Sequence, residues 1–76
     1  MEKDQVNPDK VYANDIIETY YGSEIVFLVE VFLNDTTIIR FKSGKKTICY
    51  SKEFLNITRT AKSFKNTINH KRDFKK

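Results

Sequence analysis

Apolar residues concentrate in the middle of the chain, where the stretch from Ile25 to Leu33 contains a single charged residue, Glu30. β-Branched and aromatic side chains dominate this stretch, so the pattern predicts a strand over about residues 24–33. The stretch has no polar face. It is therefore expected at the centre of a sheet, covered on each side.

Two further strands are expected after short turns. The pair Asn34-Asp35 tolerates positive φ and predicts a two-residue hairpin turn, which leads into an alternating strand over about residues 36–43. Gly44 provides the left-handed position of a second turn, and a third strand follows over about residues 46–50. The middle of the chain therefore predicts a three-stranded antiparallel meander.

The N-terminal region is expected to begin with a flexible segment, residues 1–7, and to continue as a helix. Asn7 can cap a helix and Pro8 suits its first position, which predicts a helix over about residues 8–15. Residues 16–21 carry both a helical spacing of apolar residues and a high content of β-formers. Their conformation, helix or strand, is left open.

The region after the meander is expected to be partly helical. Ser51 predicts a short capped helical turn over residues 51–55, and residues 56–59 suggest a short edge strand. Residues 60–76 carry apolar side chains at helical spacing among many lysines, which predicts a basic C-terminal helix or tail. The expected fold class is α+β, a single domain compact over residues 8–59.

Length and composition narrow the class of protein. The 76 residues suffice for one small domain and leave no room for a large enclosed active site. The longest apolar run is far shorter than the roughly 20 residues of a membrane span, and the N-terminus lacks the apolar stretch of a signal peptide. The single cysteine excludes an internal disulfide and suits a reducing cytoplasm.

Charge is divided unevenly along the chain. Through Ile38 there are two lysines and eight acidic residues, a net charge of −6, whereas from Ile39 onward twelve lysines and arginines oppose two acids, a net charge of +10. A field segregated in this way can steer an anionic partner to one face of the protein. The sequence therefore indicates a basic binding surface.

Candidate catalytic and metal-binding groups are scarce. His70 stands alone in a basic segment, where a solvated side chain is expected, and one histidine with one cysteine cannot assemble a zinc site. Cys49 lies within an expected strand and is interpreted as a small buried or edge thiol. Neither isolated glycine forms a phosphate-binding loop. The chain is therefore expected not to be an enzyme and to use no cofactor or metal.

Six segments carry a resemblance to known small domains over roughly residues 16–62: Tyr21–Val26, Val29–Val31, Asn34-Asp35, Ile38–Phe41, Ser43–Lys45 and Tyr50–Leu55. In this order they resemble the small β-rich modules of phage-encoded HNH endonucleases and AP2-type DNA-binding proteins, and they are similar to small SH3-like barrels. No HNH motif follows them. The resemblance implies a DNA-binding part without the nuclease. The Asn-, Lys- and Ile-rich composition also resembles phage gene products, which implies the cytoplasm of an infected or lysogenic bacterial host.

The basic residues of the second half form the predicted binding set. Cations with interleaved aromatic rings suit binding to a phosphate backbone, since cations displace counterions and rings stack on bases. Phe41 is expected in the core. The predicted nucleic-acid or partner-binding residues are Arg40, Lys42, Lys45, Lys46, Tyr50, Lys52, Arg59, Lys62 and Lys65.

The leading hypothesis is a small phage-type nucleic-acid-binding protein that contacts phosphates through a basic hairpin and tail, with DNA favoured over RNA. One alternative is an interaction protein that binds an acidic protein surface and inhibits a host nucleic-acid enzyme or defence complex, as an anti-CRISPR-like inhibitor would. A second alternative is a self-assembling structural protein, in which the acidic half of one copy meets the basic half of the next. A homodimer is left open, and no membrane partner is expected.

Overall fold

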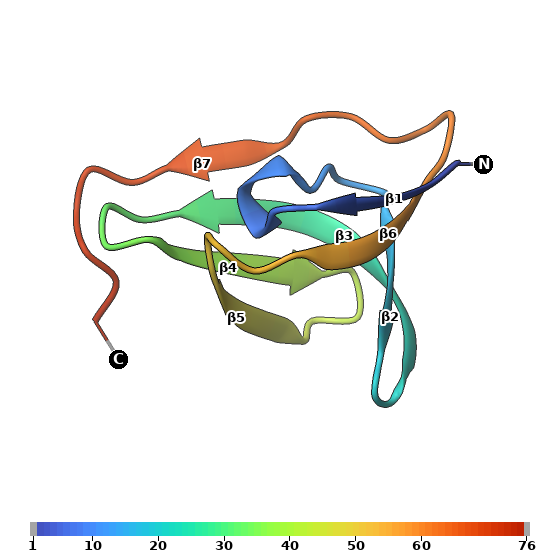
Figure 1. Ribbon diagram of the computed structural model, residues 1–76, viewed down its shortest axis with the longest axis horizontal. Helices are drawn as coiled ribbons and strands as arrows, with labels where there is room; N and C mark the ends of the chain where they lie inside the picture. Colours follow the sequence, from blue (N-terminus) through green and yellow to red (C-terminus); the bar gives the residue numbers. More distant parts are fainter. Residues whose placement is uncertain (1, 76) are drawn as a thin grey trace.

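The computed structural model describes residues 2–75, and within them it contains seven β-strands, one 3-10 turn and no α-helix (Figure 1). The predicted α+β class is therefore wrong, and the protein is all-β. The elements are β1 (Glu2–Val6), η1 (Pro8–Lys10), β2 (Ile16–Thr19), β3 (Gly22–Val31), β4 (Thr36–Phe41), β5 (Lys46–Tyr50), β6 (Leu55–Arg59) and β7 (Thr67–Asn69).

The strands form one open sheet in the order β1-β6-β2-β3-β4-β5. Every neighbouring pair along this path is antiparallel, and β7 lies off the path in parallel pairing with β3. The predicted meander is present as β3, β4 and β5. Residues 56–59 belong to β6, which is not the expected edge strand because it pairs with β1 on one side and β2 on the other.

Strand β3 joins the two parts of this sheet. Its first residues pair with β2, and its later residues pair with β4 and with β7. The register between β3 and β4 shifts between Val26 and Leu28, so Phe27 is the extra residue of a β-bulge. The bulge places Val26 and Val29, three positions apart, together in the core, while Phe27 is 54% exposed.

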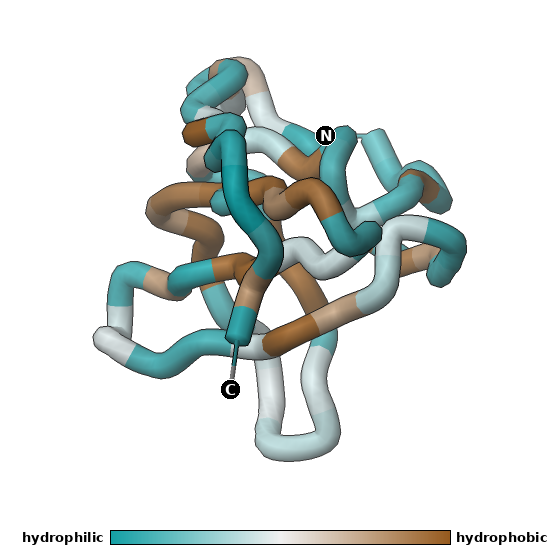
Figure 2. The backbone as a smooth tube through the Cα atoms, turned by 90° about the vertical axis from the view of Figure 1, so that its left-hand side faces the viewer, coloured by the Kyte–Doolittle hydropathy of each residue, from teal (hydrophilic) through white to brown (hydrophobic). Residues whose placement is uncertain are grey.

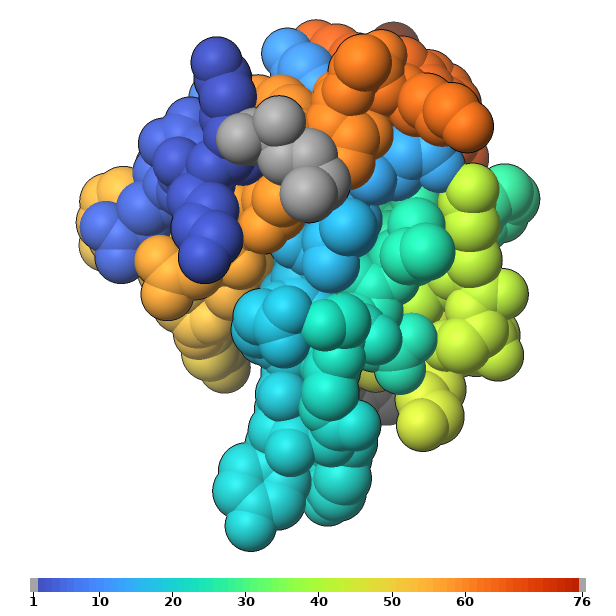
Figure 3. Space-filling view, turned by 90° about the vertical axis from the view of Figure 1, so that its right-hand side faces the viewer, coloured from blue at the N-terminus to red at the C-terminus, as the bar shows by residue number. Residues whose placement is uncertain are grey.

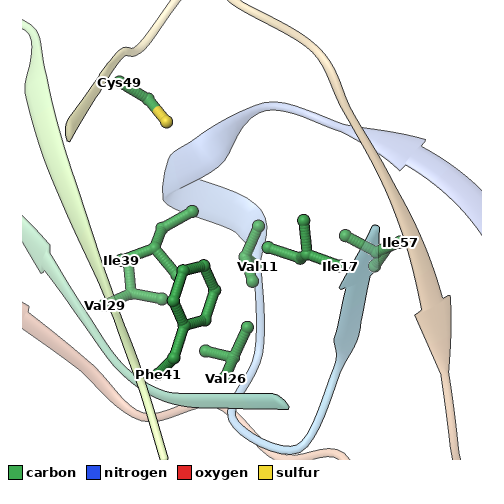
Figure 4. Packing of buried hydrophobic residues seen from close by; sticks show 8 residues of the cluster. All are labelled: Val11, Ile17, Val26, Val29, Ile39, Phe41, Cys49 and Ile57. Carbon is green, nitrogen blue, oxygen red and sulfur yellow. The ribbon is translucent and has the colours of Figure 1, made fainter. Parts of the chain in front are cut away.

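The core lies where strands β2 to β6 and the segment after η1 converge. Figure 4 shows that its side chains point toward one another from these elements. Phe41 is buried among them, as predicted, and burial of the cluster from water is the main favourable contribution to folding. The cluster consists of Val11, Ile17, Val26, Val29, Ile39, Phe41, Cys49 and Ile57.

The predicted N-terminal helix is reduced to the three residues of η1. Asn7 does not cap it, because the Asn7 side-chain amide donates hydrogen bonds to the carbonyl oxygens of Ser51 and Glu53, at 3.0 and 2.9 Å. Residues 16–19 form β2, since their β-branched side chains suit a strand that pairs on both sides. The expected flexible segment contains β1, which pairs with β6.

The predicted helical turn at residues 51–55 is also absent. The Ser51 N–H donates to the Asp35 carbonyl, and the Ser51 and Glu53 carbonyls accept the Asn7 amide, so these groups are engaged outside any helix. Leu55 already belongs to β6.

The predicted basic C-terminal helix does not form. Thr60 and Ser63 exchange local hydrogen bonds that favour a turn, and Phe64 pairs with Ala13 in an isolated bridge. Residues 67–69 are a strand, β7. Further along, the Asn34 side chain binds both the N–H and the carbonyl of Phe74, at 3.1 Å each, which attaches the C-terminal segment to the β3–β4 turn.

The turns of the meander use the residues that the sequence favours. Gly44 has φ of 92° and Asp35 has φ of 59°, so both adopt the left-handed conformation. The β3–β4 turn is longer than the predicted two residues. The Phe32 N–H donates to the Thr36 carbonyl, so the loop between these two residues contains three residues.

Candidate functional site

A hollow of about 690 Å³ lies between the β2–β3 hairpin and the β4–β5 turn. Figure 3 shows the hairpin protruding from the body of the molecule, with the β4–β5 turn on the same flank. The hollow brings exposed tyrosines of one hairpin close to cations of the other. The residues that line it are Thr19, Tyr20, Tyr21, Glu24, Arg40, Phe41, Gly44, Lys45, Lys46 and Thr47.

Tyr20 and Tyr21 form the tip of the β2–β3 hairpin and are 95% and 88% exposed. Their rings meet edge to face, with centroids 5.2 Å apart. Figure 2 shows this loop projecting beyond the body of the molecule, while the hydrophobic stretches of the chain gather within that body. Neither tyrosine is among the binding residues predicted from the sequence. Two adjacent aromatic residues directly before Gly22, at a turn position that favours polar residues, are the signal that could have identified them.

The hairpin tip is held by hydrogen bonds. Thr19 Oγ1 donates to the Gly22 carbonyl at 2.7 Å and accepts the Tyr21 N–H at 3.2 Å. Gly22 has a φ of 116°, a backbone conformation that is rare for residues with a side chain. The glycine therefore adopts the positive φ of this turn, and neither Tyr20 nor Tyr21 does. The two rings are therefore presented on an ordered turn.

Four of the predicted cations gather around the β4–β5 turn: Arg40, Lys42, Lys45 and Lys46. Lys42, Lys45 and Lys46 are exposed, and among residues 2–75 neither Lys42 nor Lys46 forms an ion pair. Lys45 Nζ lies 4.0 Å from Glu24 Oε2, a long and solvent-exposed contact.

Two carboxylates lie beside these cations, and both have partners. Glu24 Oε1 accepts a hydrogen bond from Ser43 Oγ at 2.9 Å. Glu30 Oε2 lies 2.9 Å from Arg40 Nε, and Glu30 Oε1 lies 3.3 Å from His70 Nε2. Burial raises the pKa of Glu30, but hydrogen bonds and Coulombic attraction from Arg40 and His70 together outweigh it, so the pKa is lower than its ordinary value.

A second, smaller hollow of about 480 Å³ lies on another side of the same turn. It is lined by Phe27, Phe41, Lys42 and Gly44, so it shares Phe41 and Gly44 with the first hollow. The exposed ring of Phe27 thus lies beside Lys42, in the same combination of aromatic side chain and cation.

Arg59 belongs to the structural framework and not to an open binding surface. Its guanidinium forms two contacts with the fully buried carboxylate of Asp15, Nε–Oδ1 at 3.2 Å and Nη2–Oδ2 at 2.9 Å. It also donates to the Lys10 carbonyl and lies 3.9 Å from the centroid of the Tyr12 ring. The hydrogen bond to Asp15 raises the pKa of Arg59.

The remaining predicted residues lie away from the two hollows. Tyr50 is at the opposite end of β5 from Lys46, next to Thr36, and Lys52 follows it in the turn after β5. Lys62 and Lys65 belong to the β6–β7 connection, which runs along the side of the molecule away from the hairpin tip (Figure 1). All four side chains are exposed, and none of them belongs to the group of cations around the β4–β5 turn.

His70 and Cys49 have structural environments. His70 stacks on Phe32 with ring centroids 4.3 Å apart and contacts Glu30, so the predicted solvated side chain is wrong. Cys49 is a buried free thiol, as interpreted from the sequence, and burial raises its pKa. Within residues 2–75, no group of three or more His, Cys, Asp or Glu side chains is arranged to hold a metal ion.

Comparison of the chain with protein-family models, curated proteins and solved structures gave no match. No helix able to cross a bilayer occurs between Glu2 and Lys75.

Proposed function

We propose that this protein is a non-enzymatic nucleic-acid-binding protein that contacts the phosphate backbone through the β4–β5 turn. The observation that carries this proposal is the group of three exposed lysines on one short turn, with Arg40 at the edge of the adjoining hollow. Exposed lysines bind phosphates as point charges and release condensed counterions, which gives affinity without base contacts.

The nearby acids leave this turn electropositive. Glu30 is engaged by Arg40 and His70 and is only 15% exposed, and Glu24 is 16% exposed and bound to Ser43. The lysine ammonium groups therefore reach further into solvent than the carboxylates do. An approaching polyanion meets the cations first, and its association is accelerated at low ionic strength.

The test is a salt series of binding to a mixed-sequence duplex and to a single strand of the same sequence, measured by fluorescence anisotropy. Affinity is expected to fall linearly on a log–log plot against salt, with a slope set by the number of phosphates contacted. The variant Lys42→Glu/Lys45→Glu/Lys46→Glu is expected to reduce affinity at least about 100-fold at low salt, since it removes three phosphate contacts and adds repulsion.

A matched control separates this turn from the rest of the basic half. Lys52→Glu/Lys62→Glu/Lys65→Glu changes the net charge by the same amount at exposed positions outside the two hollows. It is expected to weaken binding much less. If this control abolishes binding and the turn variant retains it, the contact lies in the β5–β6 turn or the β6–β7 connection, and the β4–β5 turn is excluded as the binding site. Absence of binding to either probe at about 50 mM salt, where electrostatic affinity is strong, overturns the proposal.

A further inference from the structure

Exposed aromatic rings lie on both sides of the basic β4–β5 turn. Tyr20 and Tyr21 border one hollow, and Phe27 borders the other, while both hollows share Phe41 and Gly44 of the turn. Lysines line the same hollows as the rings: Lys45 and Lys46 line the first hollow, and Lys42 lines the second. Each hollow thus combines exposed rings with lysines, and the two hollows adjoin at Phe41 and Gly44.

The orientation of Phe27 is fixed by the backbone. Ile25 and Phe27 are 45% and 54% exposed while Val26 between them is buried, so Phe27 keeps the ordinary strand alternation and the bulge shifts the faces of the residues after it. The Phe27 carbonyl accepts a hydrogen bond from the Asn66 side chain at 2.8 Å, which connects the bulge to the residue just before β7. The ring of Phe27 therefore lies exposed on the same side as Lys42, with which it lines the second hollow.

We propose that the ligand of this surface is single-stranded nucleic acid, which crosses the β4–β5 turn with its phosphates on the lysines and its bases stacked on Tyr20, Tyr21 and Phe27. This inference rests on the proposed function and specifies its ligand. A single strand exposes the faces of its bases, and these can stack on aromatic side chains without sequence preference. In a duplex the base faces are covered by neighbouring base pairs, so the rings gain no such contact.

The arrangement also favours a single strand over an acidic peptide. Carboxylates of a peptide could pair with the lysines, but they provide no planar partner for the exposed rings of Tyr20, Tyr21 and Phe27. A nucleotide chain repeats a negative charge and a flat base in every unit, which matches the combination of lysines and exposed rings in both hollows.

The experiment compares binding of the full chain to an oligothymidylate and to a duplex, at one salt concentration, for the wild type and two ring variants. Tyr20→Ala/Tyr21→Ala and Phe27→Ala are each expected to weaken single-strand binding about tenfold or more, as loss of base stacking does. Duplex binding, which depends on the lysines, is expected to change little. Tyr20→Phe/Tyr21→Phe keeps the rings and is expected to retain affinity.

Tyr50→Ala is the matched control, because Tyr50 is a 63% exposed tyrosine outside both hollows. It is expected to leave affinity unchanged. The chain contains no tryptophan, so tyrosine emission is a direct second readout. Stacking on Tyr20 and Tyr21 is expected to quench this emission when oligothymidylate is added, and circular dichroism of each variant verifies that it is folded.

The outcomes distinguish the two proposals. The single-strand inference is overturned if the protein binds single strand and duplex with equal affinity, the ring variants lose no affinity and tyrosine emission is not quenched. In that case, binding that still depends on the lysines supports the proposed function. Failure of the wild type to bind either probe overturns both. Loss of duplex and single-strand binding to the same extent in folded ring variants also overturns the stacking inference.

Discussion

The ion pair between Asp15 and Arg59 shows how a single charged residue can be committed to the fold. Asp15 is fully buried, and its carboxylate accepts the Tyr12 N–H at 2.8 Å in addition to both contacts from Arg59. A buried carboxylate needs such partners because its desolvation is costly. The pair links the segment before β2 to the end of β6, which are distant in the sequence.

Replacement of Asp15 is expected to destabilise the protein strongly. Asp15→Ala leaves the Arg59 guanidinium and the Tyr12 N–H without their acceptor, which is expected to lower the free energy of unfolding by about 2–4 kcal/mol. Asp15→Asn keeps an acceptor oxygen and should cost less. Urea denaturation measures both, with Glu53→Gln as an exposed control. A loss in Asp15→Ala no larger than in the control would contradict this structural role.

Glu30 makes stability depend on pH in the acidic range. Its pKa is lowered from the ordinary 4.5 by Arg40 and His70 against the opposing effect of burial. The stabilisation from the ionised carboxylate is therefore present above that ordinary value and is lost as the pH falls through the lower folded value. Glu30→Gln is expected to flatten the dependence of the unfolding free energy on pH over roughly pH 3 to 5.

Urea unfolding at a series of pH values measures this effect, and Glu53→Gln is again the control, as an exposed acid. An unchanged pH dependence in Glu30→Gln would show that the contacts with Arg40 and His70 do not favour the ionised form.

At the level of elements, the strands were predicted more accurately than the helices. The meander β3–β5 was recoverable because alternation and turn residues are local signals, and Gly44 adopts the conformation predicted for it. The helix signal at Asn7 failed because its amide is engaged by residues 51 and 53, a contact across the sequence that no local pattern contains. Likewise, the apolar stretch of β3 gave no indication of a bulge at Phe27.

The C-terminal segment is another element whose order depends on distant contacts. Asn34→Ala removes both side-chain hydrogen bonds to Phe74 and is expected to cost about 0.5–1.5 kcal/mol locally. The Phe74 amide should then exchange with solvent several-fold faster. Hydrogen exchange by NMR measures this, with Asn56→Ala as the control at an exposed asparagine of β6. Equal exchange of the Phe74 amide in both variants would exclude Asn34 as its anchor.

On the scale of the whole molecule, the charge division of the sequence does not survive as two separate faces. Acids of the first half pair with cations of the second in the contacts Asp15–Arg59 and Glu30–Arg40. These pairings could not be deduced from the linear pattern, because they depend on the strand order β6-β2-β3-β4. The lysines of the β4–β5 turn were predictable as an exposed cluster, whereas the proximity of Tyr20 and Tyr21 required the folded sheet.

Strand β3 has one further consequence for molecular recognition. It is ten residues long, and it extends from the hairpin that carries the tyrosines to the end where β7 pairs with it. The tip of the β2–β3 hairpin is therefore continuous with the most extensively paired strand of the molecule. Because of this, a ligand that binds at the tip has to order little of the protein backbone. Association should then carry a small entropic penalty from the protein, and most of the ordering on binding should occur in the ligand.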